Sequence, residues 1–289
     1  MGREYHYRTD SIEEELMVYL FSDRDRLREI LKDKSIYLFL DYDGTLVPIR
    51  NTPDPARSIL PLSQRNLLRN IMKRGILLAI VSGRSLKDLK RMAGIKGVIY
   101  SGNHGMEIEG PGIRFKYPVK AGLRQTVKRL GHEIQKGLGK IKGVFVEDKG
   151  LTFSVHYRLA KRTDIPKVKT IVVAAARPYV KRGQIAVNEG KKILEVRPAV
   201  KWDKGKMVSW LINGKRLKPS SALPVYIGDD TTDEDAFRTL GPKGITIFVG
   251  KPRHSHARYY IKSPAEVRRL LKTILTIRKG QRDGRDREG

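Results

Sequence analysis

The sequence predicts an α/β protein: a Rossmann-like parallel-sheet core with an inserted α+β cap domain that contains an antiparallel sheet and two helices. Two observations support this prediction. Short apolar runs typical of buried strands alternate with segments at helical spacing, which indicates a parallel sheet covered by helices on both faces. Midway along the chain the order changes to helix, strand, strand, helix, strand, strand, which indicates a separate α+β unit.

The first part of the core is expected over residues 1–117. Ser11 and Glu14 match a capping box, and apolar residues at helical spacing follow, so we expect a helix that begins at Ser11. Two later helices should end at Gly75 and Gly94, because glycine readily adopts the backbone conformation that ends a helix. The elements expected after the first helix are a strand at 36–40, a helix at 63–75, a strand at 76–81, a helix at 85–94 and a strand at 97–101.

The cap domain is expected over residues 118–197, and the core should resume over 198–278. A helix from Ser263, with Pro264 behind it, should close the fold. The polar, glycine-containing end predicts a disordered tail over 279–289. The elements expected in the cap are a helix at 123–138, strands at 143–150 and 151–158, a helix at 164–180 and strands at 183–190 and 191–198. Those expected in the resumed core are a helix at 205–214, a strand at 223–229, a helix at 233–241 and a strand at 244–250.

The composition excludes several kinds of protein. The 289 residues include no cysteine, so disulfides, thiol catalysis and cysteine-ligated metals are excluded. The longest apolar runs are too short to span a bilayer, and the N-terminal ten residues contain no hydrophobic signal region. We therefore expect a cytoplasmic protein with no membrane partner, and our expectation for its oligomeric state is a monomer.

The formal net charge of +28 raises the question of an anionic partner such as nucleic acid. Lysine and arginine are scattered along the chain rather than clustered in one arm, which favours a solvated basic surface. No zinc-finger spacing or RNA-binding aromatic motif is present. Nucleic acid is therefore not expected as a partner, although a nucleic-acid-binding protein stays open as a remote alternative.

Polar and acidic residues follow four of the expected strands. In an open parallel sheet, ligands bind outside the carboxyl ends of the strands, so these residues should meet at one edge. They are Asp41 and Asp43 after the first strand, Ser82, Gly83 and Arg84 after the second, Asn103 and His104 after the third, and Asp229, Asp230 and Asp233 after the fourth.

This edge has the chemistry of a phosphoryl-transfer site. Clustered carboxylates from Asp41, Asp43 and Asp229 would repel one another unless a cation neutralised them, and Mg²⁺ prefers such oxygen ligands. The hydroxyl of Ser82 suits a phosphate oxygen, and Lys204, at the start of a helix, would complete the charge balance.

Four motifs in this order resemble the signatures of the haloacid dehalogenase-like phosphatases. They are DYDGTL at 41–46, SGR at 82–84, KG at 204–205 and GDDTTDEDAF at 228–237. Together with GNHGMEI at 102–108, VEDKGLTFSVHYR at 146–158 and LEVRP at 194–198, they resemble the trehalose-6-phosphate phosphatases, a family within that superfamily.

The resemblance implies a role for each residue at the sheet edge. Asp41 would attack phosphorus and form an aspartyl-phosphate, and Asp43 would protonate the leaving sugar oxygen and later activate water. Mg²⁺ would be held by Asp41, the Asp43 carbonyl and Asp229. The phosphate ligands would be Ser82, Gly83 and Lys204, while Asp230 and Asp233 would orient Lys204 or metal-bound waters.

The resemblance also implies a sugar site in the cap. Glu147, Lys149 and Glu195 would bind the disaccharide hydroxyls. Asn103 and His104 are assigned to substrate binding as well, with loop-fixing hydrogen bonds as the open alternative. For Arg84 two roles stay open, binding of phosphate and pairing with an acidic side chain. His156 lies on an expected strand and should be packed in the structure rather than functional.

The function that follows is Mg²⁺-dependent hydrolysis of trehalose 6-phosphate to trehalose and phosphate in trehalose biosynthesis. The partner would be a small sugar phosphate. Sucrose phosphate and mannosyl-3-phosphoglycerate stay open as alternative substrates, because the cap decides between them.

Overall fold

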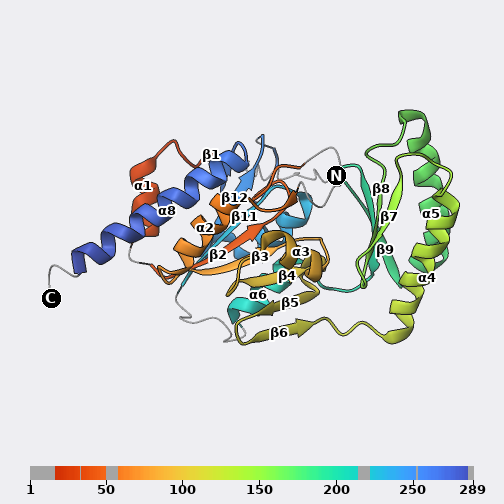
Figure 1. Ribbon diagram of the computed structural model, residues 1–289, viewed down its shortest axis with the longest axis horizontal. Coiled ribbons are helices and arrows are strands. Elements are labelled where there is room, and N and C mark those ends of the chain that lie inside the picture. The colour runs from red at the N-terminus through yellow and green to blue at the C-terminus, as the bar shows by residue number, and fades with distance from the viewer. Residues whose placement is uncertain (1–16, 33, 50–57, 214–221, 252, 286–289) are drawn as a thin grey trace, which may run out of the picture.

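The computed structural model describes residues 17–32, 34–49, 58–213, 222–251 and 253–285 of the chain. These residues form two β-sheets, which lie side by side with helices around them (Figure 1). The strands of the larger, core sheet are β1 (Val18–Tyr19), β2 (Ile36–Asp41), β3 (Leu77–Val81), β4 (Ile99–Gly102), β5 (Glu107–Gly110), β6 (Ile113–Lys116), β11 (Leu223–Gly228), β12 (Ile245–Val249) and β13 (Tyr259–Ile261).

The core sheet has the order β1-β13-β12-β11-β2-β3-β4-β5-β6, and its strands from β1 to β4 pair in parallel. Beyond β4, the strands β5 and β6 pair antiparallel. The helices around this sheet are α1 (Arg24–Leu31), α2 (Leu62–Met72), α3 (Leu86–Ala93), α6 (Lys204–Asn213), α7 (Glu234–Leu240) and α8 (Pro264–Arg285). The predicted Rossmann-like core is confirmed.

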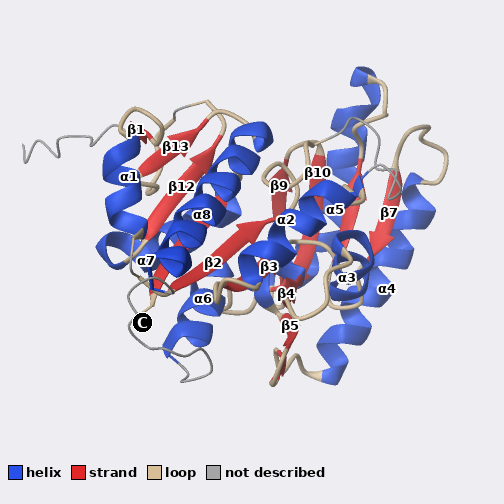
Figure 2. Ribbon diagram, turned by 60° about the vertical axis from the view of Figure 1, so that its left-hand side comes forward, coloured by secondary structure: helices blue, strands red, loops and turns tan. Residues whose placement is uncertain are grey.

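Strand β2 lies in the middle of the sheet and is buried along its whole length. Because side chains alternate along a strand, Leu38 and Leu40 pack into one apolar cluster, while Tyr37 and Phe39 pack into another on the opposite face. Helices flank the core sheet in Figure 2 as well. Burial on both faces explains why this strand reads as an unbroken apolar run, and it brings Asp41 to the carboxyl edge.

The cap contains α4 (Ala121–Leu138), β7 (Phe145–Asp148), β8 (Phe153–His156), α5 (Ile165–Lys181), β9 (Ile185–Gly190) and β10 (Ile193–Pro198). Its antiparallel sheet has the order β7-β8-β10-β9, so the predicted succession of elements is confirmed. A separate apolar cluster, which includes Leu130, Val155 and Val172, fills the space between sheet and helices. The cap therefore has its own core.

Both ends of the chain differ from the prediction. The expected N-terminal helix is wrong where the structure describes it, because Val18 and Tyr19 form strand β1 beside β13, and the helix begins only at Arg24. Ser11 and Glu14 lie outside the described residues. The tail expected over 279–289 begins too early, since α8 continues to Arg285. A helix that is already formed extends at little cost, so polar residues can prolong it.

Within the described parts of the chain, no helix is both long enough and apolar enough to cross a membrane.

Candidate active site

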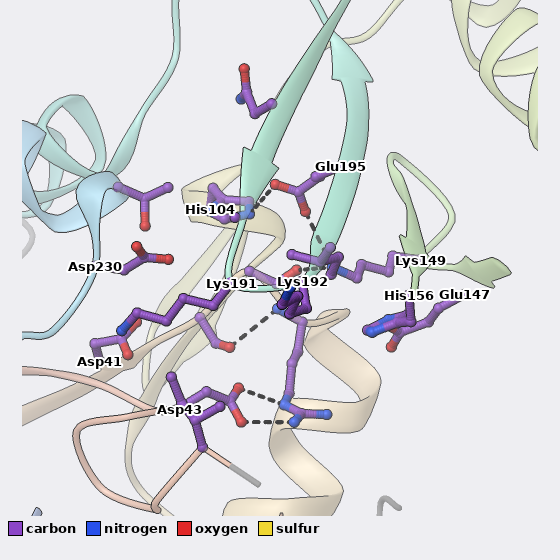
Figure 3. A pocket seen from close by; sticks show the side chains of 18 of the residues that line it. Asp41, Asp43, His104, Glu147, Lys149, His156, Lys191, Lys192, Glu195 and Asp230 are labelled. Carbon is purple, nitrogen blue, oxygen red and sulfur yellow. Dashed lines mark hydrogen bonds and ion pairs between the residues drawn. The ribbon is translucent and has the colours of Figure 1, made fainter. Parts of the chain in front are cut away.

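A cavity of about 920 Å³ lies between the core and the cap, and residues from both parts line it. The core contributes the carboxyl ends of β2, β3 and β11, and the cap contributes its sheet and the turn between β9 and β10. Figure 3 shows side chains from the two parts pointing toward one another across this space. The structure therefore brings together sequence segments that are more than a hundred residues apart.

Asp41 and Lys204 form a buried ion pair at the end of β2. Lys204 Nζ donates to Asp41 Oδ1 at 2.7 Å and to Asp233 Oδ1 at 2.7 Å. Burial raises the pKa of Asp41 well above its usual value, although Lys204 acts in the opposite direction. Burial alone would lower the pKa of Lys204, but Asp233 and Asp41 outweigh it and raise that pKa. The lysine therefore stays charged beside the predicted nucleophile.

Asp233 holds Lys204 in place. Its Oδ1 also accepts from the Tyr226 hydroxyl at 2.8 Å, and its Oδ2 accepts from the backbone N–H groups of Asp229 and Asp230 at 3.0 Å each. Both carboxylate oxygens are thus fully engaged within the protein. Asp230 caps the short helix that begins here, because its side chain accepts from the Thr231 N–H.

Asp41 and Asp229 fit a divalent cation. One oxygen of each lies within 4.8 Å of the other, in a group that also includes Asp233. Asp229 Oδ1 is buried and has no hydrogen-bond partner, and burial raises the pKa of Asp229 to about 6. A cation would supply the missing partner. Because Asp233 is already saturated, Asp41 and Asp229 are the carboxylates available to hold it.

Gly44 allows the loop after β2 to approach Asp229. Its φ is 94°, and a Cβ at this position would lie 2.1 Å from Asp229 Oδ2. Only glycine therefore fits, and the backbone at Gly44 lies close to the Asp229 carboxylate. This arrangement is compatible with the Asp43 carbonyl, rather than its side chain, as a ligand.

The Asp43 carboxylate is paired with Arg84. Arg84 Nε donates to Oδ2 at 2.6 Å, and Arg84 Nη2 donates to Oδ1 at 2.7 Å, as the two dashed lines in Figure 3 show. Of the two roles left open for Arg84, the structure shows the acidic partner. Ser82 and Gly83 line the cavity beside it, and Ser82 Oγ accepts from the Arg84 N–H at 3.1 Å.

Three predicted sugar ligands meet at the cap side of the cavity. Glu195 lies between Lys149, whose Nζ donates to Oε1 at 3.2 Å, and His104, whose Nε2 is 2.6 Å from Oε2. Lys149 also donates to the Gly83 carbonyl oxygen at 2.9 Å. Burial alone would raise the pKa of Glu195, but His104 and Lys149 outweigh it and lower that pKa. The carboxylate therefore stays ionised in a buried position.

Glu147 has a partner that sequence reasoning missed. His156 was expected to be packed, but it lines the cavity, and its Nε2 lies 2.8 Å from Glu147 Oε2. The ring of Phe145 stacks on the imidazole with centroids 4.3 Å apart. Residues two apart on a strand share a face, so Glu147 lies on the same face of β7 as Phe145. Phe145 lies opposite His156 in the β7–β8 pair. The alternation of side chains along these two strands was therefore the signal that could have revealed the contact between His156 and Glu147.

Asn103 does not line the cavity. It is fully buried, and its side chain contacts Glu107, Lys149 and Thr152. Of the two roles considered for Asn103, these contacts favour loop fixing over substrate contact. His104, by contrast, lines the cavity.

Lys191 is a further residue that the sequence did not single out. It lies in the turn between β9 and β10, and its Nζ donates to Asp229 Oδ2 at 2.6 Å. A cap residue therefore contacts a candidate metal ligand of the core. No local pattern reveals this contact, since it depends on how the cap sits on the core.

A family model described as trehalose-phosphatase matches residues 39–265. The chain is 36% identical over 264 residues to the probable trehalose-phosphate phosphatase D of Arabidopsis thaliana, with 87% of this chain and 70% of that protein covered. It is 34% identical over 238 residues to the trehalose-phosphate phosphatase of Mycobacterium ulcerans, with 80% and 59% covered.

Solved structures agree with this match. A trehalose-6-phosphate phosphatase related protein superimposes with a TM-score of 0.70 at 26% identity, covering 86% of this chain and all of that one. The C-terminal domain of the trehalose-6-phosphate phosphatase of C. albicans has a TM-score of 0.73 at 24% identity, covering 91% and 98%, and shows the same fold. On the extent of the family match and these identities, the chain belongs to the trehalose-phosphatase family.

Proposed function

We propose that this chain hydrolyses trehalose 6-phosphate to trehalose and phosphate, as a step of trehalose biosynthesis. The observation that supports this most is the position of Asp41: it lies beside Lys204 and Asp229 on the core side of a cavity whose cap side presents Lys149 and Glu195. A phosphate-transfer centre and hydrogen-bonding groups for a sugar thus face the same space. The names of the relatives point to the same substrate.

In the proposed reaction, a carboxylate oxygen of Asp41 attacks phosphorus, and the bond between phosphorus and the sugar oxygen breaks. Asp43 gives a proton to that oxygen, which leaves as the hydroxyl of trehalose. In the second step Asp43 takes a proton from water, whose oxygen attacks the aspartyl-phosphate and releases phosphate and Asp41. For either transfer, Asp43 must give up at least one of its two bonds to Arg84.

The other core residues prepare the phosphate position. Lys204 is fixed by Asp233 and places a positive charge at Asp41, where the anionic phosphate must approach an anionic nucleophile. Ser82 and the backbone at Gly83 offer hydrogen bonds to phosphate oxygens. Bound Mg²⁺, held by Asp41, Asp229 and the Asp43 carbonyl, would supply further positive charge to these oxygens.

The cap would bind the disaccharide. Carboxylates accept hydrogen bonds from sugar hydroxyls, so Glu147 and Glu195 suit this role, while Lys149 of the cap and His104 of the adjoining core offer donors. The cavity volume of about 920 Å³ lies within the range of small-molecule sites, roughly 300–1,000 Å³.

The test is a substrate panel. Phosphate release would be measured from trehalose 6-phosphate, sucrose 6-phosphate, mannosyl-3-phosphoglycerate and glucose 6-phosphate, with Mg²⁺ and with a chelator. We expect the highest kcat/KM with trehalose 6-phosphate, dependence on Mg²⁺, and loss of turnover in Asp41→Asn. Comparable efficiencies across the panel would contradict the substrate, and an active Asp41→Asn protein would contradict the mechanism.

A monomeric state, a cytoplasmic location and the domain boundaries at 118 and 197 stay predictions. Light scattering after size exclusion would test the first, and cell fractionation the second. Expression of residues 118–197 alone would test the boundaries, because the cap has its own apolar cluster.

A further inference from the structure

The side chain of Asn103, which belongs to the core, is enclosed by a turn of the cap. Its Nδ2 donates to the Lys149 carbonyl oxygen at 3.2 Å and to Glu107 Oε2 at 2.7 Å. Its Oδ1 accepts from Thr152 Oγ1 at 3.0 Å. Asn103 and Thr152 are both 0% exposed. Both the Nδ2 and the Oδ1 of the Asn103 amide are therefore hydrogen-bonded to protein groups. Two of these three hydrogen bonds cross from core to cap.

The backbone that presents this amide is unusual. Asn103 and His104 are consecutive residues with φ of 48° and 54°, a conformation that side chains other than glycine rarely adopt and that asparagine tolerates best. The Asn103 N–H donates to the Arg84 carbonyl oxygen at 2.7 Å, and the His104 N–H donates to that of Ser82 at 3.1 Å. The strained turn is thus anchored on the candidate phosphate-binding loop, and strained backbone of this kind clusters at functional sites.

The cap turn at residues 149–152 also sets the position of Lys149. The Lys149 N–H donates to the Thr152 carbonyl oxygen at 2.9 Å and closes the turn. From this position the Lys149 side chain reaches Glu195 in the cap and the Gly83 carbonyl oxygen in the core. A shift of the turn away from Asn103 would therefore also shift Lys149 relative to both.

We propose that Asn103 and Thr152 are positioning residues that dock the cap turn on the core, so that Lys149 and Glu195 are placed to bind the sugar. This inference rests on the proposed function, because it takes these two residues as sugar ligands. When the cap is undocked, water can solvate both side chains. When it is docked without the Thr152 hydroxyl, Asn103 Oδ1 loses the donor that it has in this buried place, which disfavours the docked arrangement.

Thr152→Val is the informative variant, because it removes the hydroxyl and keeps the shape of the side chain. Thr152→Ser restores the hydroxyl. Thr246→Val is the matched control: Thr246 is also buried and also hydrogen-bonded, accepting from the Arg258 N–H at 2.9 Å, but it lies on β12, away from the cap.

Two readouts separate positioning from general damage. For Thr152→Val we expect kcat/KM with trehalose 6-phosphate to fall by about tenfold, the usual scale for one buried hydrogen-bonding group left unpaired. Hydrolysis of 4-nitrophenyl phosphate, which has no sugar, should fall by less than about twofold. Hydrogen exchange in the peptide that covers 149–154 should speed up in this variant. Thr152→Ser and Thr246→Val should resemble the wild type in both readouts.

Two results would overturn the inference: an unchanged kcat/KM in Thr152→Val, or equal losses with the two substrates. A second variant, Asn103→Gly, suits the positive φ and removes the amide. Its loss of kcat/KM should not add to the loss caused by Thr152→Val when both changes are combined. Full additivity in the double variant would also contradict a shared role. If the wild type prefers another sugar phosphate in the panel, the proposed substrate fails, and the same comparison is made with that sugar phosphate. The exchange measurement needs no substrate.

Discussion

Lys204 lies between two carboxylates at the centre of the site, and all three side chains are buried. Each charge would be costly to bury alone, so the arrangement is stable only as a set. Tyr226 and two backbone N–H groups complete the hydrogen bonds of Asp233 and thereby fix the lysine. Hydrogen bonds within the protein thus hold Lys204 at the candidate phosphate site.

Lys204→Met should destabilise the protein, because it leaves Asp41 and Asp233 buried without their cation. We expect the free energy of unfolding to fall by about 3–5 kcal/mol in metal-free buffer, as for other buried pairs that lose one partner. Urea unfolding at pH 8 would measure it. Lys206→Met, on the same helix but half exposed, is the control and should change stability by less than about 1 kcal/mol. Similar losses in the two variants would contradict this account.

Glu195 makes stability depend on pH. Its pKa is lowered in the folded protein, so its contribution is complete above the unfolded value near 4.3 and is lost as the pH falls below it. Glu195→Gln should therefore lose less stability than the wild type between about pH 5 and pH 3. Unfolding midpoints across this range would measure the slopes. Glu29→Gln, on an exposed position of α1, should retain the slope of the wild type.

At the scale of elements, most strands were predictable, but four short ones were not. The strand that ends at Asp41 and the helix–strand order of the cap follow from periodicity and from glycines in the turns. Strands β5, β6 and β13 were missed, and β1 was taken for helix. Each of these four strands has only two to four residues, and pairing with neighbouring strands decided its structure.

Two glycines of the cap should respond in opposite directions to alanine. Both have open space where a Cβ would be added. Gly122 lies in α4 with ordinary helical geometry, so Gly122→Ala should stabilise by up to about 1 kcal/mol. Gly183 follows α5 with φ of 64°, so Gly183→Ala should destabilise by about 1–2 kcal/mol. Thermal unfolding of the two variants would measure this, and shifts of the same sign would contradict it.

At the scale of the whole molecule, the position of the cap determines the contacts of the active site. Lys191 in the cap is bound to Asp229, and Lys149 is bound to the Gly83 carbonyl oxygen. These contacts join a candidate metal ligand and the candidate phosphate-binding loop of the core to Lys191 and Lys149 of the cap. Movement of the cap would therefore change both sides of the cavity together.

Lys191→Met should bind Mg²⁺ more tightly than the wild type, because the ammonium group of Lys191 occupies an oxygen of Asp229 that a cation would otherwise share. We expect a several-fold lower dissociation constant, consistent with the loss of one competing charge near a partly buried carboxylate. Calorimetric titration of the protein with Mg²⁺ would measure it without substrate. Lys192→Met removes the same charge from the neighbouring position and is the control. Equal changes in the two variants would indicate a general charge effect and contradict direct competition.

The sequence by itself determined the core, the cap and the residues at the strand ends, because apolar periodicity and the rule for parallel sheets are local or topological. Asp41, Ser82 and Asp229 could be predicted in this way, and Lys204 from the positive charge that their cluster requires. Only the tertiary structure decided which groups face one another: Arg84 beside Asp43, Lys191 beside Asp229 and Thr152 beside Asn103. Such pairs depend on distances between segments far apart in the chain, which no pattern within one segment encodes.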